Sequence, residues 1–141
     1  MKRALIPIEG SAAALRTLAY ALSELAPGED AELHLLHVQA SLIHALATPL
    51  LAADLIEAEQ RHSIEQLSAP ALAQARAEGR RAVPHLRIGA SAAEIADCAA
   101  ELGCDVIVMG NRRLGAVGGL ALGSVAQKTV HLAQMPVTLV K

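Results

Sequence analysis

The sequence predicts a single α/β domain, a sandwich in which helices flank a five-stranded parallel sheet. Three observations predict this fold. The chain has 141 residues, the usual size of one compact domain, so we take residues 1–141 as one unit. Short aliphatic or β-branched runs alternate with longer segments rich in alanine and leucine at helical period. Five such aliphatic runs occur along the chain, one for each predicted strand.

The first part of the chain supplies two strands and a helix between them. Arg3–Ile8 is predicted as a strand buried on both faces, because its apolar residues run on rather than alternate. Ser11 is a suitable N-cap for the helix that follows, and Pro27 and Gly28 end that helix. Glu32–Val38 is predicted as the second strand. The connection that follows carries no pattern that predicts its structure.

A long helical segment comes next. The residues from Leu51 to Ala77 favour helix, and Gly79 closes the segment. A proline inside a helix costs about 3 kcal/mol, because it lacks an N–H and its ring clashes with the preceding turn. We therefore predict a kink at Pro70, or a fresh helix capped by Ser68.

The last part of the chain repeats the alternation. Val83–Ile88 is predicted as the third strand, and Ser91 with Glu94 three residues later forms a capping box for the next helix. The remaining predicted elements are a fourth strand over Asp105–Met109, a helix over Ser124–Ala133 that Ser124 caps, and a fifth strand over Pro136–Val140.

The balance of charge argues against nucleic acid as a partner. Twelve basic and 14 acidic residues give a net charge of −2, so the chain has no strong positive field. Tyr20 is the single aromatic residue, which removes the stacking platform that single-strand binders use. The six histidines show no metal-ligand spacing, and His34 and His37 should face opposite sides of one strand. We predict that the histidines are polar edge residues or satisfied strand residues.

We predict a cytoplasmic protein with no membrane partner. The longest apolar region, residues 42–56, is interrupted by polar residues and by Pro49, and it falls short of the roughly 20 apolar residues that a bilayer span needs. Basic residues at the N-terminus resemble the start of a signal peptide, but the apolar run after them stops at Glu9. Cys98 and Cys104 are too few and too irregularly spaced for a disulfide framework or a metal site, so we expect both in the core.

A glycine-rich loop lies between the fourth strand and the last helix. Its glycines are Gly110, Gly115, Gly118, Gly119 and Gly123. Glycine reaches positive φ and lets backbone N–H groups approach a ligand, and a helix N-terminus adds unpaired donors, so one interpretation is a phosphate cradle. Standard nucleotide motifs fail, because Ser124 stands where the Walker A lysine would be and no G-x-G-x-x-G follows a strand. The local motif alone supports phosphate binding and a purely structural loop equally.

A resemblance that covers essentially the whole chain favours phosphate binding over a purely structural loop. The segments that carry it are Lys2–Ser11, Leu33–Val38, Arg87–Ile95, Gly103–Gly110, Leu122–Ala126 and Pro136–Lys141. Together they resemble the universal stress protein family. The resemblance implies a flavodoxin-like, five-stranded parallel α/β fold that usually forms dimers. ATP-binding members of the family carry a loop of glycine, two residues, glycine, nine residues, then glycine and serine or threonine.

One position departs from that loop. Gly110 matches its first glycine and Gly123 with Ser124 matches its end, but Arg113 stands where the second glycine is expected. If the position needs positive φ, an arginine is strained there and its side chain fills the space of the phosphates. If the backbone tolerates it, the guanidinium pairs with a phosphate, helped by Arg112 beside it. The intact remainder of the loop favours binding.

The resemblance implies a nucleotide site at the carboxyl ends of the first and fourth strands. Glu9 stands where the family usually has aspartate, and its carboxylate could accept from a ribose hydroxyl or adenine amine, or hold Mg²⁺ carried by the phosphates. The adenine pocket would be lined by Pro7, Ile8, Val38 and Met109, and Val125 and Ala126 would present helix N–H groups to phosphates beside Gly110, Gly123 and Ser124. A core role explains Ile8 and Val38 at least as well.

The predicted function is that of a dimeric stress-response module that binds ATP, or AMP or ADP, and is not an enzyme. No general base, catalytic lysine or nucleophile stands out, so any ATP hydrolysis would be slow and incidental. One alternative is a nucleotide-free interaction protein of the same fold, with Arg113 closing the pocket. Another is a slow metal-dependent ATP hydrolase, with a metal beside Glu9. The family's dimers pair through the last strand, so the resemblance implies a homodimer through Pro136–Val140, an aliphatic sheet edge that needs covering.

Overall fold

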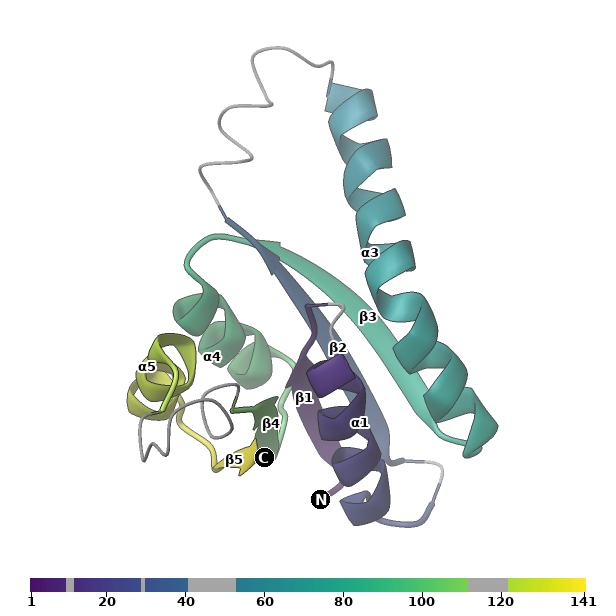
Figure 1. Ribbon diagram of the computed structural model, residues 1–141, viewed down its shortest axis with the longest axis vertical. Coiled ribbons are helices and arrows are strands. Elements are labelled where there is room, and N and C mark those ends of the chain that lie inside the picture. The colour runs from purple at the N-terminus through teal and green to yellow at the C-terminus, as the bar shows by residue number, and fades with distance from the viewer. Residues whose placement is uncertain (10–11, 29, 41–52, 112–121) are drawn as a thin grey trace.

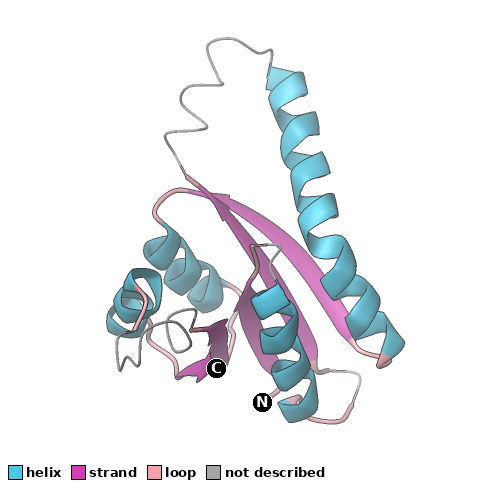
Figure 2. Cartoon of the chain, in the orientation of Figure 1, coloured by secondary structure: helices cyan, strands magenta, loops and turns pink. Residues whose placement is uncertain are grey.

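The computed structural model describes residues 1–9, 12–28, 30–40, 53–111 and 122–141. Helices and strands alternate along these residues (Figure 1; Figure 2). In chain order they are β1 (Arg3–Pro7), α1 (Ala12–Glu24), β2 (Glu32–Gln39), α3 (Ala53–Ala77), β3 (Arg81–Ile88), α4 (Ser91–Glu101), β4 (Val106–Gly110), α5 (Ser124–Leu132) and β5 (Val137–Val140). The predicted helix cap Ser11 lies outside the described residues.

The five strands form one sheet in the order β3-β2-β1-β4-β5, and all four neighbouring pairs are parallel. The predicted five-stranded parallel α/β fold is therefore confirmed. The chain builds outward from β1 to β3, then returns to the other side of β1 and builds outward again to β5. The strand order thus reverses between β1 and β4, which is where open α/β sheets form a crevice at their carboxyl ends.

Helices cover both faces of the sheet (Figure 1). Leu18 and Leu22 of α1 pack with Ala71 of α3 in one core cluster, on one face. Ile95 of α4 and Ala126 of α5 belong to the second cluster, on the opposite face. The central strand β1 contributes to both: Ala4, Leu5 and Ile6 are completely buried, as predicted for a strand covered on both sides. Cys98 and Cys104 are free and buried, which confirms the expectation for both.

The fresh helix predicted to start at Ser68 is wrong, while the alternative, a kink at Pro70, stays a prediction. Helix α3 runs without interruption from Ala53 to Ala77, and Ser68 lies in its interior, fully buried, rather than at a cap. Pro70 itself is exposed. Leu67 before the proline and Ala71 after it both pack against the same core cluster. Packing on both sides of Pro70 therefore holds one helix together against the local cost of the proline.

The two predicted serine caps are also wrong. Ser91 and Ser124 are each the first residue of a helix, and the N-caps are Ala90 and Gly123, neither of which makes a side-chain capping bond. The amide of Glu94, the residue predicted to complete the capping box, donates to the carbonyl of Ala90 at 3.0 Å. Each helix starts with a backbone turn, which leaves its serine hydroxyl for another role.

Candidate functional site

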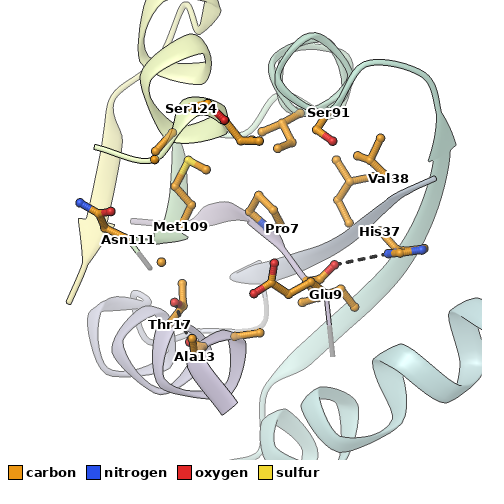
Figure 3. Close-up of a pocket in the computed structure, with 18 residues that line it drawn as sticks. Pro7, Glu9, Ala13, Thr17, His37, Val38, Ser91, Met109, Asn111 and Ser124 are labelled. Carbon is orange, nitrogen blue, oxygen red and sulfur yellow. Dashed lines mark hydrogen bonds between the residues drawn. The ribbon is translucent and has the colours of Figure 1, made fainter. Parts of the chain in front are cut away.

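A cavity of about 470 Å³ opens at the carboxyl ends of β1, β2 and β4, beside the reversal in strand order (Figure 3). The strands and the residues directly after them contribute Pro7, Ile8, Glu9, Leu36, His37, Val38, Met109, Gly110 and Asn111. The helices and the N-cap of α5 contribute Ala13, Ala14, Thr17, Ser91, Ile95, Gly123, Ser124, Val125 and Ala126. The position agrees with the general rule for ligands of open parallel sheets.

Ten of the twelve residues predicted for the nucleotide site line this one cavity. They are Pro7, Ile8, Glu9, Val38, Met109, Gly110, Gly123, Ser124, Val125 and Ala126. Arg112 and Arg113 lie outside the described residues. The fold thus brings together residues that are more than 100 positions apart in sequence, while their roles toward a ligand stay predictions.

One part of the cavity is apolar with a carboxylate beside it. Leu36 is completely buried, and Ile8 and Met109 are nearly so, which gives the cavity a fixed aliphatic floor. Glu9 is exposed, and its carboxylate extends into the space between Met109 and Thr17 (Figure 3). A flat apolar ring with polar edges fits such a floor, and the carboxylate accepts hydrogen bonds from hydroxyl or amine groups.

The two glycines at the ends of the loop have different roles. Neither Gly110 nor Gly123 has positive φ, so the conformational reason given for glycine does not apply at these two positions. A Cβ on Gly110 would lie 3.1 Å from the hydroxyl oxygen of Thr17, so this glycine allows β4 to approach α1 closely. A Cβ on Gly123 would meet no heavy atom of the described residues within 4 Å. Gly110 therefore serves packing, and Gly123 leaves space in the cavity.

The corner around Gly123 is suited to an anion. Gly123 is the N-cap of α5, and Ser124 opens the helix with an exposed side chain. The first-turn N–H groups of a helix have no intrahelical acceptor, and the helix dipole favours negative charge beside them. Backbone donors, a hydroxyl and the absence of a Cβ are chemically suited to contact an anionic group such as a phosphate.

Sequence reasoning missed four polar residues of the cavity wall. Thr17 is almost fully buried, and its hydroxyl donates to the Ala13 carbonyl at 3.0 Å. Asn111 is buried too, and its backbone N–H donates to the Val140 carbonyl at 2.9 Å. Ser91 and His37 complete the set. The rule that ligands gather at the carboxyl ends of parallel strands could have found Ser91, His37 and Asn111, whereas Thr17 lies within a helix and carries no such signal.

Two other kinds of site have no support in the described part of the chain. Its His, Cys, Asp and Glu residues form no cluster of three or more that could hold a metal ion. No helix within it is long and apolar enough to cross a bilayer.

The fold and the cavity define a class: a doubly wound α/β domain with a ligand pocket where the strand order reverses. The universal stress protein family model matches residues 1–141, and the chain belongs to this family. It is 36% identical over 140 residues to the "Universal stress protein in QAH/OAS sulfhydrylase 3'region" of Thermus aquaticus, covering 99% of this chain and 98% of the relative. It is 28% identical to universal stress protein G of Escherichia coli O157:H7, covering 99% of each.

Solved structures share the fold. The universal stress protein of Archaeoglobus fulgidus is 26% identical with a TM-score of 0.73, covering all of this chain and 98% of that one. That protein in complex with dAMP is 24% identical with a TM-score of 0.69. A universal stress protein in complex with cAMP is 23% identical with a TM-score of 0.75, covering 99% of this chain and 97% of that one. An Arabidopsis thaliana family protein with AMP bound is 18% identical with a TM-score of 0.68, covering 100% and 92%.

Proposed function

We propose that this protein is a cytoplasmic, homodimeric regulatory module that binds ATP, or AMP or ADP, and has no catalytic role beyond slow, incidental hydrolysis. The observation that carries the proposal is the single cavity in which an apolar floor, a carboxylate and an open helix N-terminus meet. Family membership and the nucleotides named for solved relatives support it.

The proposed pose follows from the chemistry of the walls. The adenine ring lies against the aliphatic floor formed by Ile8, Leu36 and Met109. The ribose reaches Glu9, whose carboxylate accepts from a hydroxyl or meets Mg²⁺ carried by the phosphates. The phosphates lie beside Gly123 and Ser124, where the donors of α5 are available.

A matched pair of substitutions on α5 tests this pose. Gly123→Val places a branched side chain in the cavity without a clash with the described residues, so we expect AMP and ATP affinity to fall more than tenfold with little change in stability. Gln127→Val changes an exposed residue one turn further along and outside the cavity wall. Isothermal titration calorimetry with each nucleotide measures affinity, and thermal unfolding checks the fold. Equal affinity in the two variants contradicts the pose.

A second measurement asks whether the purified protein already carries nucleotide. The chain has no tryptophan and one tyrosine, so its own absorbance at 280 nm is low and a nucleotide peak at 260 nm stands out. We expect a peak that disappears after denaturation and filtration. The absence of the peak, together with no calorimetric heat on adding ATP or AMP, would favour the nucleotide-free interaction protein. Sustained turnover of ATP would instead favour the hydrolase.

The variant Arg113→Gly distinguishes the two interpretations of the loop departure. If the guanidinium clamps a phosphate, its removal weakens ATP binding, because a charge-assisted bond is lost. If the side chain fills the site, its removal creates or strengthens binding. The proposal expects weaker binding, and the opposite change would favour the interaction protein.

The proposed dimer forms along β5. This strand lies at one end of the sheet order, and its four residues Val137–Val140 are all uncharged and only half buried. An aliphatic edge strand with free backbone groups pairs readily with another strand. A second copy of the same chain presents the same edge, so the two copies pair through β5 by a two-fold axis.

A further inference from the structure

Two histidines meet on the sheet below the cavity. His34 of β2 is 5% exposed, and its Nδ1 lies 2.9 Å from Nε2 of His85 on the edge strand β3. The ring centroids are 5.1 Å apart, with the ring planes tilted by 45°. At this distance the two nitrogens must share one proton, since two lone pairs or two N–H groups would repel each other.

The carboxylate of Glu32 indicates which ring nitrogen of His34 carries the proton. Nε2 of His34 makes no hydrogen bond within the described residues, and Oε2 of Glu32 lies 3.5 Å from it. A carboxylate favours an N–H on the nitrogen that faces it, so the neutral His34 carries its proton on Nε2. Nδ1 of His34 is then the acceptor, and Nε2–H of His85 donates to it. Glu32 is held in turn by Arg81, whose Nε lies 3.1 Å from Oε1.

The charged surroundings oppose a positive charge on either ring. Burial is the main cause that lowers the pKa of both His34 and His85 below its usual value. Arginines from the flanking strands act in the same direction, while Glu32 acts against it. The titratable and charged groups that face the pair or its neighbours are Glu32 of β2, Arg3 of β1, Arg81 and Arg87 of β3, and Cys98 and Glu101 of α4, which contact Arg87.

The pair adjoins the floor of the cavity. His34 and Leu36 are two residues apart on β2, so their side chains lie on the same face of the sheet. Leu36 is also the residue that faces His85 across the strand pair. Leu36 is fully buried and lines the cavity, so it is the residue of β2 that lies between the histidine pair and the cavity.

We propose that the His34–His85 pair is a proton-operated switch that makes nucleotide binding in the neighbouring cavity depend on pH. Near neutral pH the single shared proton ties β3 to β2 and holds Leu36 in place. In acid, both rings become charged, two N–H groups meet head-on among three arginines, and the half-buried His85 turns outward. The floor then loosens and the nucleotide is released. This inference rests on the proposed function.

The test compares AMP affinity at about pH 7.5 and about pH 5.5 by calorimetry. We expect the natural protein to bind roughly tenfold more weakly at the lower pH. The variant His85→Gln should lose most of this dependence, because an amide can donate to neutral His34 or accept from charged His34 without a charge of its own. His62→Gln, on the exposed part of α3, is the matched control and should retain the dependence.

Other results of this experiment would overturn the proposed switch or the proposed function. Equal affinity at the two pH values overturns the switch, as does a dependence that survives in His85→Gln and vanishes in His37→Gln, which changes a histidine of the cavity wall. No binding at about pH 7.5 means that the proposed function has failed. In that case the ligand-free protein decides: amide resonances of Leu36 and Val38 that titrate in the natural protein and not in His85→Gln retain the switch, and resonances that stay fixed overturn it.

Discussion

The two edges of the sheet are built differently. On the β3 edge, the backbone N–H of Gly89 donates to the carbonyl of Gln39 in β2. Along an edge strand, the backbone groups of successive residues face the neighbouring strand and the outside in turn, so the backbone nitrogen of Pro84 faces outward. On the β5 edge, the backbone N–H groups of Ile107 and Asn111 donate to the carbonyls of Pro136 and Val140. The backbone N–H groups of Val137 and Leu139 therefore face away from β4. Proline removes an outward donor from one edge, while the other retains both of its outward donors.

The β3 and β5 edges also differ in their charged residues. Arg81 and Arg87 lie on β3, where they pair with Glu32 and Glu101, and β5 carries no charge between Val137 and Val140. Proline and charged side chains are common devices that protect an edge strand from pairing. The β3 edge is therefore protected, and the β5 edge is available to a second copy of the chain.

The largest expected effect comes from removing a donor on the β5 edge. Leu139→Pro deletes an amide that faces away from β4, so the sheet keeps its own hydrogen bonds while the partner strand loses one. We expect the dimer to dissociate at micromolar concentration in equilibrium sedimentation. Leu139→Ala removes similar packing but keeps the amide, and it should remain dimeric. A natural protein that sediments as a monomer would contradict the proposed dimer along β5.

A second effect concerns the link between β3 and β2. Burial lowers the pKa of His34 and His85, so the unfolded chain, with values near 6.5, binds more protons than the folded chain as the pH falls below that value. The stability from the neutral pair is thus complete above about pH 6.5 and is lost in more acidic solution. We expect about 1 kcal/mol less unfolding free energy near pH 5, after allowance for solvent screening. Urea unfolding measures this loss, which should be smaller in His85→Gln, where the buried His34 remains; an undiminished loss would contradict the contribution of His85.

A smaller effect should follow from restoring a donor on the β3 edge. Pro84→Val provides an outward amide in the middle of an edge strand and adds a residue that favours strands. We expect weak association beyond the dimer, visible only at high concentration in light scattering, with stability changed by less than about 1 kcal/mol. The control Pro84→Lys restores the same amide but adds a charge, and it should not associate. Equal association of both variants would show that proline is not the protecting feature.

The smallest effect is expected at the ion pair between β3 and α4. Glu101→Gln removes the carboxylate that pairs with Arg87, and both side chains are partly exposed to solvent. Pairs of this kind contribute at most about 1 kcal/mol and are weakened by salt. Thermal unfolding at low and high salt should therefore show a small loss in the variant that nearly disappears at high salt. A loss independent of salt would indicate packing rather than charge.

The sheet could be predicted because its three inner strands, β1, β2 and β4, are largely buried and give aliphatic runs. Ten cavity residues could also be predicted, since they lie at strand ends, in the loop that matches the family pattern or at the start of the helix that follows it. What the sequence could not provide was tertiary packing. It is packing on both sides of Pro70 that preserves α3, and it is the contact between Gly110 and Thr17 that makes a helix residue part of the cavity.

The serines show a further limit. Ser91 and Ser124 have the local chemistry of helix caps, and a cap differs from a first helical residue by one position only. That one position decides whether a hydroxyl satisfies its own helix or lies free in a cavity. Sequence patterns seldom fix helix boundaries this finely. Ser91 was therefore predicted only as a cap, whereas the family loop pattern also placed Ser124 in the nucleotide site.

The two glycines that border the loop have a practical consequence. Gly110 lies against α1, and Gly123 is the N-cap of α5, so both residues that border the loop belong to described elements. These two junctions define where one loop can be exchanged for another. Loops from relatives with glycine at the position of Arg113 can be inserted between Asn111 and Leu122 while both junctions are kept, and a series of such chimaeras would separate what the loop contributes to ligand choice from what the domain contributes.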